Sequence, residues 1–266
     1  MPKSKHTQIV AFSPGQKLTE EGIIEFVKSQ VAHHKGALVL VLPESVFDMT
    51  AISRREGKLL AGRINKILQT HGNAYVFMSV IESRKTPTRQ TISNTGYIIT
   101  PSRKNPWKVY PKVSTYGPNT PKSKRLQPYD HVILQHNVNN QFETHSSLIK
   151  HWLKRAKKVR TFPTVKINGK RTQLRVCADT NLENLPEKLK TKQKADTIIV
   201  PSMNLITRHN TIRRLLATTG AKSAIFVDGH WGVSHYSKKR VHEINGITHF
   251  PKAGITIRRH PITKRR

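Results

Sequence analysis

The chain has 266 residues and a net charge of +32, from 47 Lys and Arg residues against 15 Asp and Glu residues. This length allows one large domain or two small ones, with a sizeable buried core. The single cysteine excludes an internal disulfide and fits a reducing compartment or a reactive thiol. No apolar run reaches the ~20 residues of a membrane span, and the first residues lack the apolar core of a signal peptide. We therefore expect a soluble, cytoplasmic protein without membrane association.

The positive charge is concentrated in three stretches. Ten Lys or Arg residues and no acid lie between Glu82 and Asp130, and ten more with no acid lie between Glu143 and Asp179. From residue 238 to the end, nine basic residues accompany one acid. Such charge attracts polyanions, of which nucleic acid is the commonest, and an aromatic content of 6% favours phosphate contacts over base stacking. A generally basic surface without a bound polyanion is the alternative.

The N-terminal part alternates apolar runs with helical patterns. Strands are predicted at 8–12, 37–42 and 74–81, and helices at 19–35 and 52–71. Thr19 is the expected N-cap of the first helix, and Gly36 and Gly72 are the expected stops. The second helix has an apolar stripe, predicted to be buried, at Leu59, Leu60, Ile64, Ile67 and Leu68. This alternation predicts parallel strands joined by right-handed crossovers.

The rest of the chain continues as an α/β pattern with one interruption. Further strands are predicted at 91–100, 174–177, 195–202 and 221–228, a strand or hairpin at 248–257, and a helix at 210–219. The stretch 101–128 is expected to be a basic loop. We predict one domain over residues 1–257, followed by a polar, basic tail at 258–266 that frays.

The interruption is a segment at about 137–164 that does not follow the alternation. Within it, residues 146–160 show a helical apolar stripe, and basic residues occupy much of the remaining surface: Lys150, Lys154, Arg155, Lys157, Lys158 and Arg160. One interpretation is a surface helix with a solvated basic face. The other is a helix that docks nucleic acid or another polyanion.

Three residues with catalytic side chains each stand beside a strand-like run. Six apolar residues end abruptly at Pro43 and Glu44, and carboxyl ends of buried strands are where α/β folds place their chemistry. Lys112 lies within the first of the basic stretches, in the part at 101–128 that is expected to be a loop, and Cys177 ends the run that starts at residue 174. Each alone has a simpler explanation, as a solvated glutamate, a solvated lysine or a small core residue.

Together, these three side chains could carry out acyl transfer. A thiolate attacks a carbonyl carbon well, but a free thiol is mostly protonated at pH 7, so Glu44 would accept the proton of Cys177. The Lys112 ammonium and the backbone N–H of Ala178 would stabilise the developing oxyanion. Glu44 would then pass its proton to the leaving amine and activate water. The chain order Glu, Lys, Cys is therefore more informative than any one of the three.

This constellation resembles the nitrilase, or carbon–nitrogen hydrolase, superfamily. Val41-Leu-Pro-Glu44 is similar to the family's strand ending in the general base, and Tyr110-Pro-Lys112 to the segment with the catalytic lysine. The stretch 169–179 resembles the strand leading into the nucleophile elbow, and 194–202 resembles the family's next strand.

The resemblance implies a four-layer αββα sandwich with catalytic Glu44, Lys112 and Cys177. It also implies cleavage of a non-peptide C–N bond in a small amide or nitrile, no metal or cofactor, and a homodimer. The chain departs from the family in lacking a second Glu shortly after Lys112, in its long separation between Lys112 and Cys177, and in its basicity. The basic helix is the expected insertion.

Two functions follow as hypotheses. The first is a thiol-dependent hydrolase of an anionic amide or nitrile, which works through a Cys177 thioester. The second is a catalytically weak or inactive nitrilase-like scaffold that binds nucleic acid through its basic surfaces.

Overall fold

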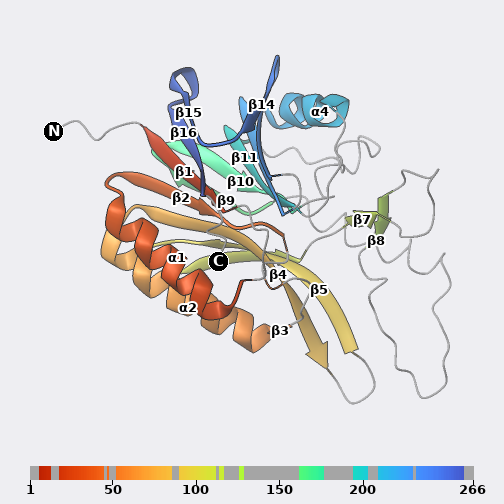
Figure 1. Cartoon of the computed structure of the whole chain (residues 1–266). Helices are drawn as coiled ribbons and strands as arrows, with labels where there is room; N and C mark the ends of the chain where they lie inside the picture. The colour runs from red at the N-terminus through yellow and green to blue at the C-terminus, as the bar shows by residue number, and fades with distance from the viewer. Residues whose placement is uncertain are drawn as a thin grey trace, which may run out of the picture.

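The structure is a computed structural model, and it describes residues 6–12, 18–44, 47, 52–85, 90–111, 114–116, 126–128, 162–176, 194–202, 209–229 and 232–260. These residues form a mixed α/β fold with two main β-sheets (Figure 1). A further pair of short strands, β7 (Ser114–Tyr116) and β8 (Leu126–Pro128), forms a separate ribbon.

The larger sheet has eight strands and contains the N-terminal alternation. Its order is β15 (Ile247–Phe250), β16 (Ile255–His260), β1 (Thr7–Phe12), β2 (Ala37–Val41), β4 (Ala74–Lys85), β5 (Gln90–Ile99) and β6 (Trp107–Pro111), with β3 (Ile52–Ser53) paired to β4. Strands β1, β2 and β4 are parallel, which confirms the prediction from the sequence.

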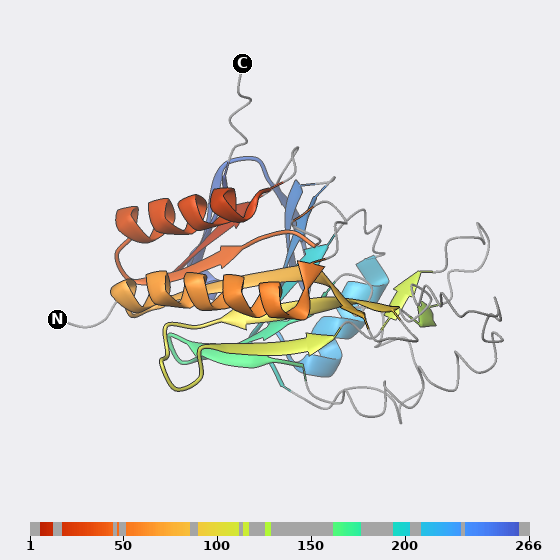
Figure 2. The same ribbon diagram turned by 90° about the horizontal axis from the view of Figure 1, so that it is seen from below.

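Two helices cover one face of this sheet, α1 (Glu20–His33) and α2 (Arg54–His71) (Figures 1 and 2). The Thr19 hydroxyl accepts a hydrogen bond from the Gly22 N–H, as its position predicts for an N-cap. Ser53 and Glu56 form a capping box at α2, and Gly72 ends that helix in the left-handed conformation, with φ of 77°. The predicted stripe of α2 is wrong at one position, because Leu59 is 58% exposed.

Two glycines of α2 are expected to respond oppositely to alanine. A Cβ at Gly57 would lie 2.6 Å from Oε1 of Glu82 and 3.1 Å from the Tyr97 hydroxyl, and both side chains are buried and hydrogen-bonded to each other. A Cβ at Gly62 would meet only Trp107, at 4.0 Å. Gly57→Ala should therefore cost about 1–3 kcal/mol of unfolding free energy through overpacking. Gly62→Ala should gain up to about 1 kcal/mol from helix propensity. Urea unfolding of both variants measures this, and equal effects would contradict it.

The smaller sheet has six strands. Its order is β14 (Val241–Ile244), β13 (Gly232–Ser237), β12 (Ser223–Asp228), β11 (Thr197–Ser202), β10 (Lys170–Leu174) and β9 (Thr164–Ile167). Helix α4 (His209–Thr219) packs against β12 and β13, on the opposite side of the molecule from α1 and α2 (Figures 1 and 2). Every residue of β11 and of β12 is buried, so both faces of these central strands are covered.

The two sheets pack face to face, as the side-chain alternation of β2 shows. Ala37, Val39 and Val41 belong to a core cluster shared with the strands of the smaller sheet. Leu38 and Leu40 belong to a second cluster, formed with α1 and α2. A strand that is buried on both faces must be apolar at every position, which explains the uninterrupted run before Glu44.

Further sequence predictions differ from the structure. Helix α1 ends at His33, with His34 as its C-cap, so Gly36 is not the stop that the sequence predicted. The stretch 101–128 contains β6, β7 and β8, so it is not a simple loop. The predicted strand at 174–177 is instead a hairpin, β9–β10, whose last strand residue is Leu174. Strand β16 extends to His260 and pairs with β1, so residues 258–260 of the predicted tail belong to the sheet. The basic helix predicted at 146–160 lies outside the described residues.

Among the described helices, none has the length and apolar character needed to cross a bilayer.

A buried histidine lies where the two sheets meet. The His235 ring of β13 packs 3.9 Å from the Phe250 ring of β15, measured between centroids, and 6.2 Å from that of His242. Neither ring nitrogen of His235 has a hydrogen-bond partner among the described residues. Burial, and to a lesser degree His242, lowers the pKa of His235 from 6.5 to about 4. The side chain is therefore neutral in the native protein at pH 7.

This histidine should make the fold sensitive to acid. Between pH 6.5 and 4 the unfolded chain binds a proton at position 235 that the native state excludes, so the unfolding free energy falls as the pH falls. From pH 7 to pH 4.5, His235→Leu should lose roughly 2–3 kcal/mol less than the wild type, as measured by urea unfolding at both pH values. The exposed His33→Gln variant is the control, and an acid loss in His235→Leu equal to that of the wild type would contradict the assignment.

Candidate active site

Glu44 lies at the carboxyl end of β2 and reaches across to the smaller sheet. The N–H of Leu42 still pairs with the Phe77 carbonyl of β4, at 2.9 Å, and the chain then leaves the larger sheet. The Glu44 N–H donates to the Ser202 carbonyl, at the end of β11, at 3.4 Å. The Glu44 side chain is 6% exposed. The predicted base is thus a buried carboxylate between the ends of the two sheets.

The Glu44 carboxylate is held by a neighbour that the sequence did not single out. The side-chain amide of Asn94, on β5, donates to Oε1 of Glu44 at 2.5 Å, and both side chains are buried. A hydrogen bond to the charged form fixes the orientation of a carboxylate. Asn94 is therefore a positioning residue for Glu44.

A second buried carboxylate of the larger sheet faces the other way. Glu82 accepts hydrogen bonds from the hydroxyls of Tyr97 and Thr95. Thr95 and Asn94 are consecutive strand residues, so their side chains point to opposite faces of the sheet. Glu82 therefore lies on the helix side, where Tyr97 belongs to the cluster with α1 and α2. It takes no part in the Glu44 site.

The smaller sheet contributes a serine and an aspartate. The Ser202 hydroxyl donates to Oδ2 of Asp228 at 2.8 Å, and both side chains are buried. The Ser202 carbonyl accepts from the N–H of Gly229 at 3.0 Å as well as from that of Glu44. The end of β11 is therefore hydrogen-bonded to the backbone of Glu44, and Ser202 links this end to Asp228 at the end of β12.

The segments that lead to the other two predicted residues are bonded to each other. The Val176 N–H donates to the Tyr110 hydroxyl at 2.5 Å. Val176 directly precedes Cys177, and Tyr110 stands two residues before Lys112. The paired residues Thr95 and Pro111 join the Tyr110 strand to the strand that carries Asn94.

Gly96 makes room for this contact. A Cβ at position 96 would lie 2.6 Å from Cε1 of Tyr110 and 3.0 Å from Cγ2 of Val176. Neither the Tyr110 ring nor Val176 could remain where it is beside a larger residue, so the close approach of the two segments requires glycine here.

A buried arginine stands in the segment before Cys177. The Arg175 side chain is fully buried, its Nε donates to Oε1 of Gln173 at 2.9 Å, and its guanidinium carbon lies 4.2 Å from the centre of the Phe162 ring. The Arg175 N–H also donates to the Ile199 carbonyl of β11, at 3.0 Å. A positive charge is thereby held two residues before the cysteine.

The structure describes only one of the predicted catalytic residues, Glu44. Lys112, Cys177 and Ala178 lie outside the described residues, as do the basic side chains predicted to bind nucleic acid: Lys150, Lys154, Arg155, Lys157, Lys158 and Arg160. Asn94, Ser202 and Asp228 were not predicted as site residues. Ser202 had a visible signal, because it follows an apolar run and a proline as Glu44 does. Within the described parts, no three His, Cys, Asp or Glu side chains gather as ligands for a metal ion.

No protein-family model matches the chain, and no curated protein sequence matches it. Among solved structures, it is similar to a glutamine-dependent NAD(+) synthetase from Cytophaga hutchinsonii, with 10% identity and a TM-score of 0.45 over 88% of this chain and 40% of that one. It is also similar to the glutamine-dependent NAD+ synthetase from Acinetobacter baumannii in complex with adenosine diphosphate, with 12% identity and a TM-score of 0.47 over 87% of this chain and 42% of that one. The chain spans about two fifths of the length of these synthetases.

Proposed function

We propose that the chain is a thiol-dependent hydrolase of a non-peptide C–N bond, with Cys177 as nucleophile, Glu44 as base and Lys112 as oxyanion stabiliser. One observation carries the proposal. Glu44 is a buried carboxylate that is hydrogen-bonded to Asn94 of β5 and, through its N–H, to Ser202 at the end of β11. The segments that pair with these two strands precede Lys112 and Cys177 in the chain and are bonded to each other through Tyr110 and Val176.

In the chain, Cys177 and Lys112 each come directly after a residue that the structure describes. Consecutive Cα atoms are about 3.8 Å apart, so Cys177 is one peptide unit from Val176, and Lys112 is one unit from Pro111. Arg175 supports the role of Cys177, because a nearby positive charge favours a thiolate over a thiol.

The proposed reaction has two halves. Cys177 gives its proton to Glu44, and the thiolate attacks the substrate carbonyl carbon, while the Lys112 ammonium and the Ala178 N–H stabilise the oxyanion. The C–N bond breaks as Glu44 returns the proton to the leaving nitrogen, which leaves a thioester. Water then gives a proton to Glu44 and attacks the thioester carbon. The acid leaves, and Cys177 recovers its proton from Glu44.

We further propose that the complete chain forms a four-layer αββα sandwich of the nitrilase type and acts as a homodimer on an anionic amide or nitrile. The layering is supported by α1 and α2 on the outer face of the larger sheet and by α4 against the smaller one. The anionic substrate is supported by the two basic stretches on either side of Lys112 and before Cys177.

The alkylation rate of Cys177 tests the proposal directly. With one cysteine in the chain, mass spectrometry reports labelling by iodoacetamide without ambiguity. Near pH 7, an activated thiol should label faster in the native than in the denatured protein, and Glu44→Gln should remove that advantage. Glu82→Gln is the control, since it changes a buried carboxylate on the other face of the sheet. Native labelling that is slower than denatured labelling would count against the proposal.

The net charge of +32 supports a second candidate, a nitrilase-like scaffold that binds nucleic acid through Lys150, Lys154, Arg155, Lys157, Lys158 and Arg160. Binding through phosphate contacts should fall steeply as the salt concentration rises. Titration of duplex DNA or RNA over a range of salt concentrations measures this, and a lack of binding at low salt would exclude it.

A further inference from the structure

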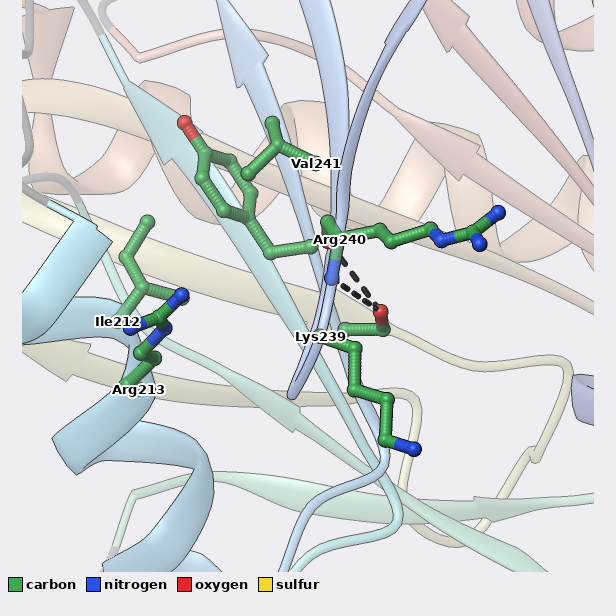
Figure 3. A pocket seen from close by; sticks show the side chains of 7 residues that line it. Ile212, Arg213, Lys239, Arg240 and Val241 are labelled. Carbon is green, nitrogen blue, oxygen red and sulfur yellow. Dashed lines mark hydrogen bonds between the residues drawn. The ribbon is translucent and has the colours of Figure 1, made fainter.

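A pocket opens between α4 and the turn that joins β13 to β14. It has a volume of about 340 Å³ and is lined by Ile212 and Arg213 from the helix and by Tyr236, Lys239, Arg240 and Val241 from the hairpin. Figure 3 shows Arg213 on the helix side and Lys239 and Arg240 on the hairpin side. This size is at the lower end of the range of small-ligand sites, roughly 300–1,000 Å³.

The hairpin turn is held in a fixed shape. The N–H of Ser237 donates to the Arg240 carbonyl at 2.9 Å. The Arg240 N–H donates to the Ser237 hydroxyl at 3.1 Å, one of the hydrogen bonds drawn in Figure 3. The backbone that carries Lys239 and Arg240 is thus braced at the edge of the pocket. Their side chains are exposed and can turn toward a ligand.

The charge of the pocket is positive and uncompensated within the described residues. Arg213, Lys239 and Arg240 have no ion-pair partner there, and no acid lines the pocket. Outside the lining residues, Glu243 of the same hairpin acts electrostatically on Tyr236. Burial and Glu243 raise the pKa of Tyr236, so its hydroxyl stays protonated and can donate a hydrogen bond.

These features fit a phosphate group better than a carboxylate. Two guanidinium groups and one ammonium supply only donors, the Tyr236 hydroxyl can donate as well, and a phosphate offers several acceptor oxygens and up to two negative charges. Arginine matches the geometry of phosphate oxygens with paired N–H donors. The apolar side chains of Ile212 and Val241 also line the pocket, where they can contact a neutral part of the same ligand.

The pocket is separate from the Glu44 site. Ser223, at the start of β12, pairs with Ser237 at the pocket, whereas Asp228, at the end of β12, belongs to the Ser202 cluster. These two ends of the strand are about 17 Å apart. A ligand in the pocket therefore does not occupy the candidate active site.

We propose that this pocket binds the phosphate group of a nucleotide, either free or within a nucleic-acid strand. The site is independent of the proposed hydrolase reaction. Its residues are also different from those of the basic stretch at 150–160. The pocket is thus one defined phosphate-binding site in a chain whose overall charge is strongly positive.

The test compares two double variants of the full chain that carry the same change of charge. Arg213→Gln with Lys239→Gln removes two cations of the pocket. Arg55→Gln with Lys66→Gln removes two exposed cations of α2, on the other side of the molecule. Binding of inorganic pyrophosphate and of a single-stranded oligonucleotide of about 20 nucleotides is measured by calorimetry at about 50 mM NaCl, where phosphate contacts are weakly screened.

The pocket variant should bind pyrophosphate at least about 10-fold more weakly than the wild type, and the α2 variant should bind it within about 2-fold. A parallel loss for the oligonucleotide identifies the strand as a source of the phosphate, and an unchanged oligonucleotide affinity identifies the free nucleotide. Because all four side chains are exposed, equal melting temperatures are expected, and the single Arg213→Gln variant repeats the test if the double variant is less stable. Equal pyrophosphate affinities in the two double variants, or no binding by the wild type, would overturn the proposal.

Discussion

Replacing Cys177 by alanine is expected to lower hydrolysis of amides and nitriles by at least about 1,000-fold, because no other side chain of the proposed site can form the thioester. Ammonia release from a panel of small anionic amides and nitriles measures the rate. The fold should survive, since the change removes one sulfur atom, and the melting temperature checks this. Unchanged turnover in Cys177→Ala would refute the proposed mechanism.

Replacing Glu44 by glutamine should cost about 100- to 10,000-fold in turnover, because the amide can neither accept the thiol proton nor activate water. The side-chain amide of Asn94 can still donate to Oε1 of the new glutamine, so the fold should be little affected and the loss of turnover should not come from unfolding. Glu82→Gln is the matched control: it neutralises another buried carboxylate of the same sheet. We expect it to lower the unfolding free energy by about 1–3 kcal/mol and to leave turnover nearly unchanged.

The two glutamine variants separate chemistry from folding. If Glu82→Gln lost as much activity as Glu44→Gln, the effect would come from a general disturbance of the sheet. If Glu44→Gln retained full activity while Cys177→Ala did not, the base would be a different residue. Asp228 is then the next candidate, because Ser202 joins it to the backbone of Glu44.

The N-terminal half of the larger sheet could be predicted because its signals are local. An apolar run of six residues is too short for a helix and too apolar for a half-exposed strand, so β2 had to be buried on both faces. Thr19 and Gly72 act on backbone groups within four residues of themselves. Signals of this kind are complete within a short window of sequence.

The remaining architecture depends on pairs that no local pattern specifies. Strand β16 completes the larger sheet by pairing with β1, with Thr7 opposite Ile255, almost the whole chain apart. The sequence predicted a strand or hairpin at 248–257 but offered no partner for it. The same holds for the packing of the two sheets, which depends on which face of each strand meets which other face.

Of the described residues of the candidate site, the sequence predicted only one that stands at the end of an apolar run, and it missed those inside strands. Glu44 stands after a proline at the end of a buried run, and this is visible in the sequence. Asn94 lies inside β5 among other polar residues, and its role depends on a neighbour fifty positions away. Tyr110 acts through a hydroxyl that meets the backbone of Val176, and a backbone partner leaves no trace in the sequence.

Replacing Gly96 by alanine is expected to disturb the candidate site without touching a catalytic residue. The new methyl group would lie 2.6 Å from the Tyr110 ring and 3.0 Å from Val176, so the two segments that precede Lys112 and Cys177 would have to move apart. Overpacking of this kind costs about 1–3 kcal/mol of unfolding free energy. A displacement of about 1 Å at a reacting group can cost about 100-fold in rate, so turnover and the native alkylation rate of Cys177 should both fall by that order.

Two further variants show whether the position of the segments is responsible. Gly246→Ala adds a methyl group where no atom lies within 4 Å, so stability, turnover and labelling should stay close to those of the wild type. Tyr110→Phe keeps the ring but removes the acceptor of the Val176 N–H, so it should reproduce part of the loss in labelling rate. If Gly96→Ala were destabilised but Cys177 reacted at the wild-type rate, the contact between Tyr110 and Val176 would support the fold alone and would not position the nucleophile.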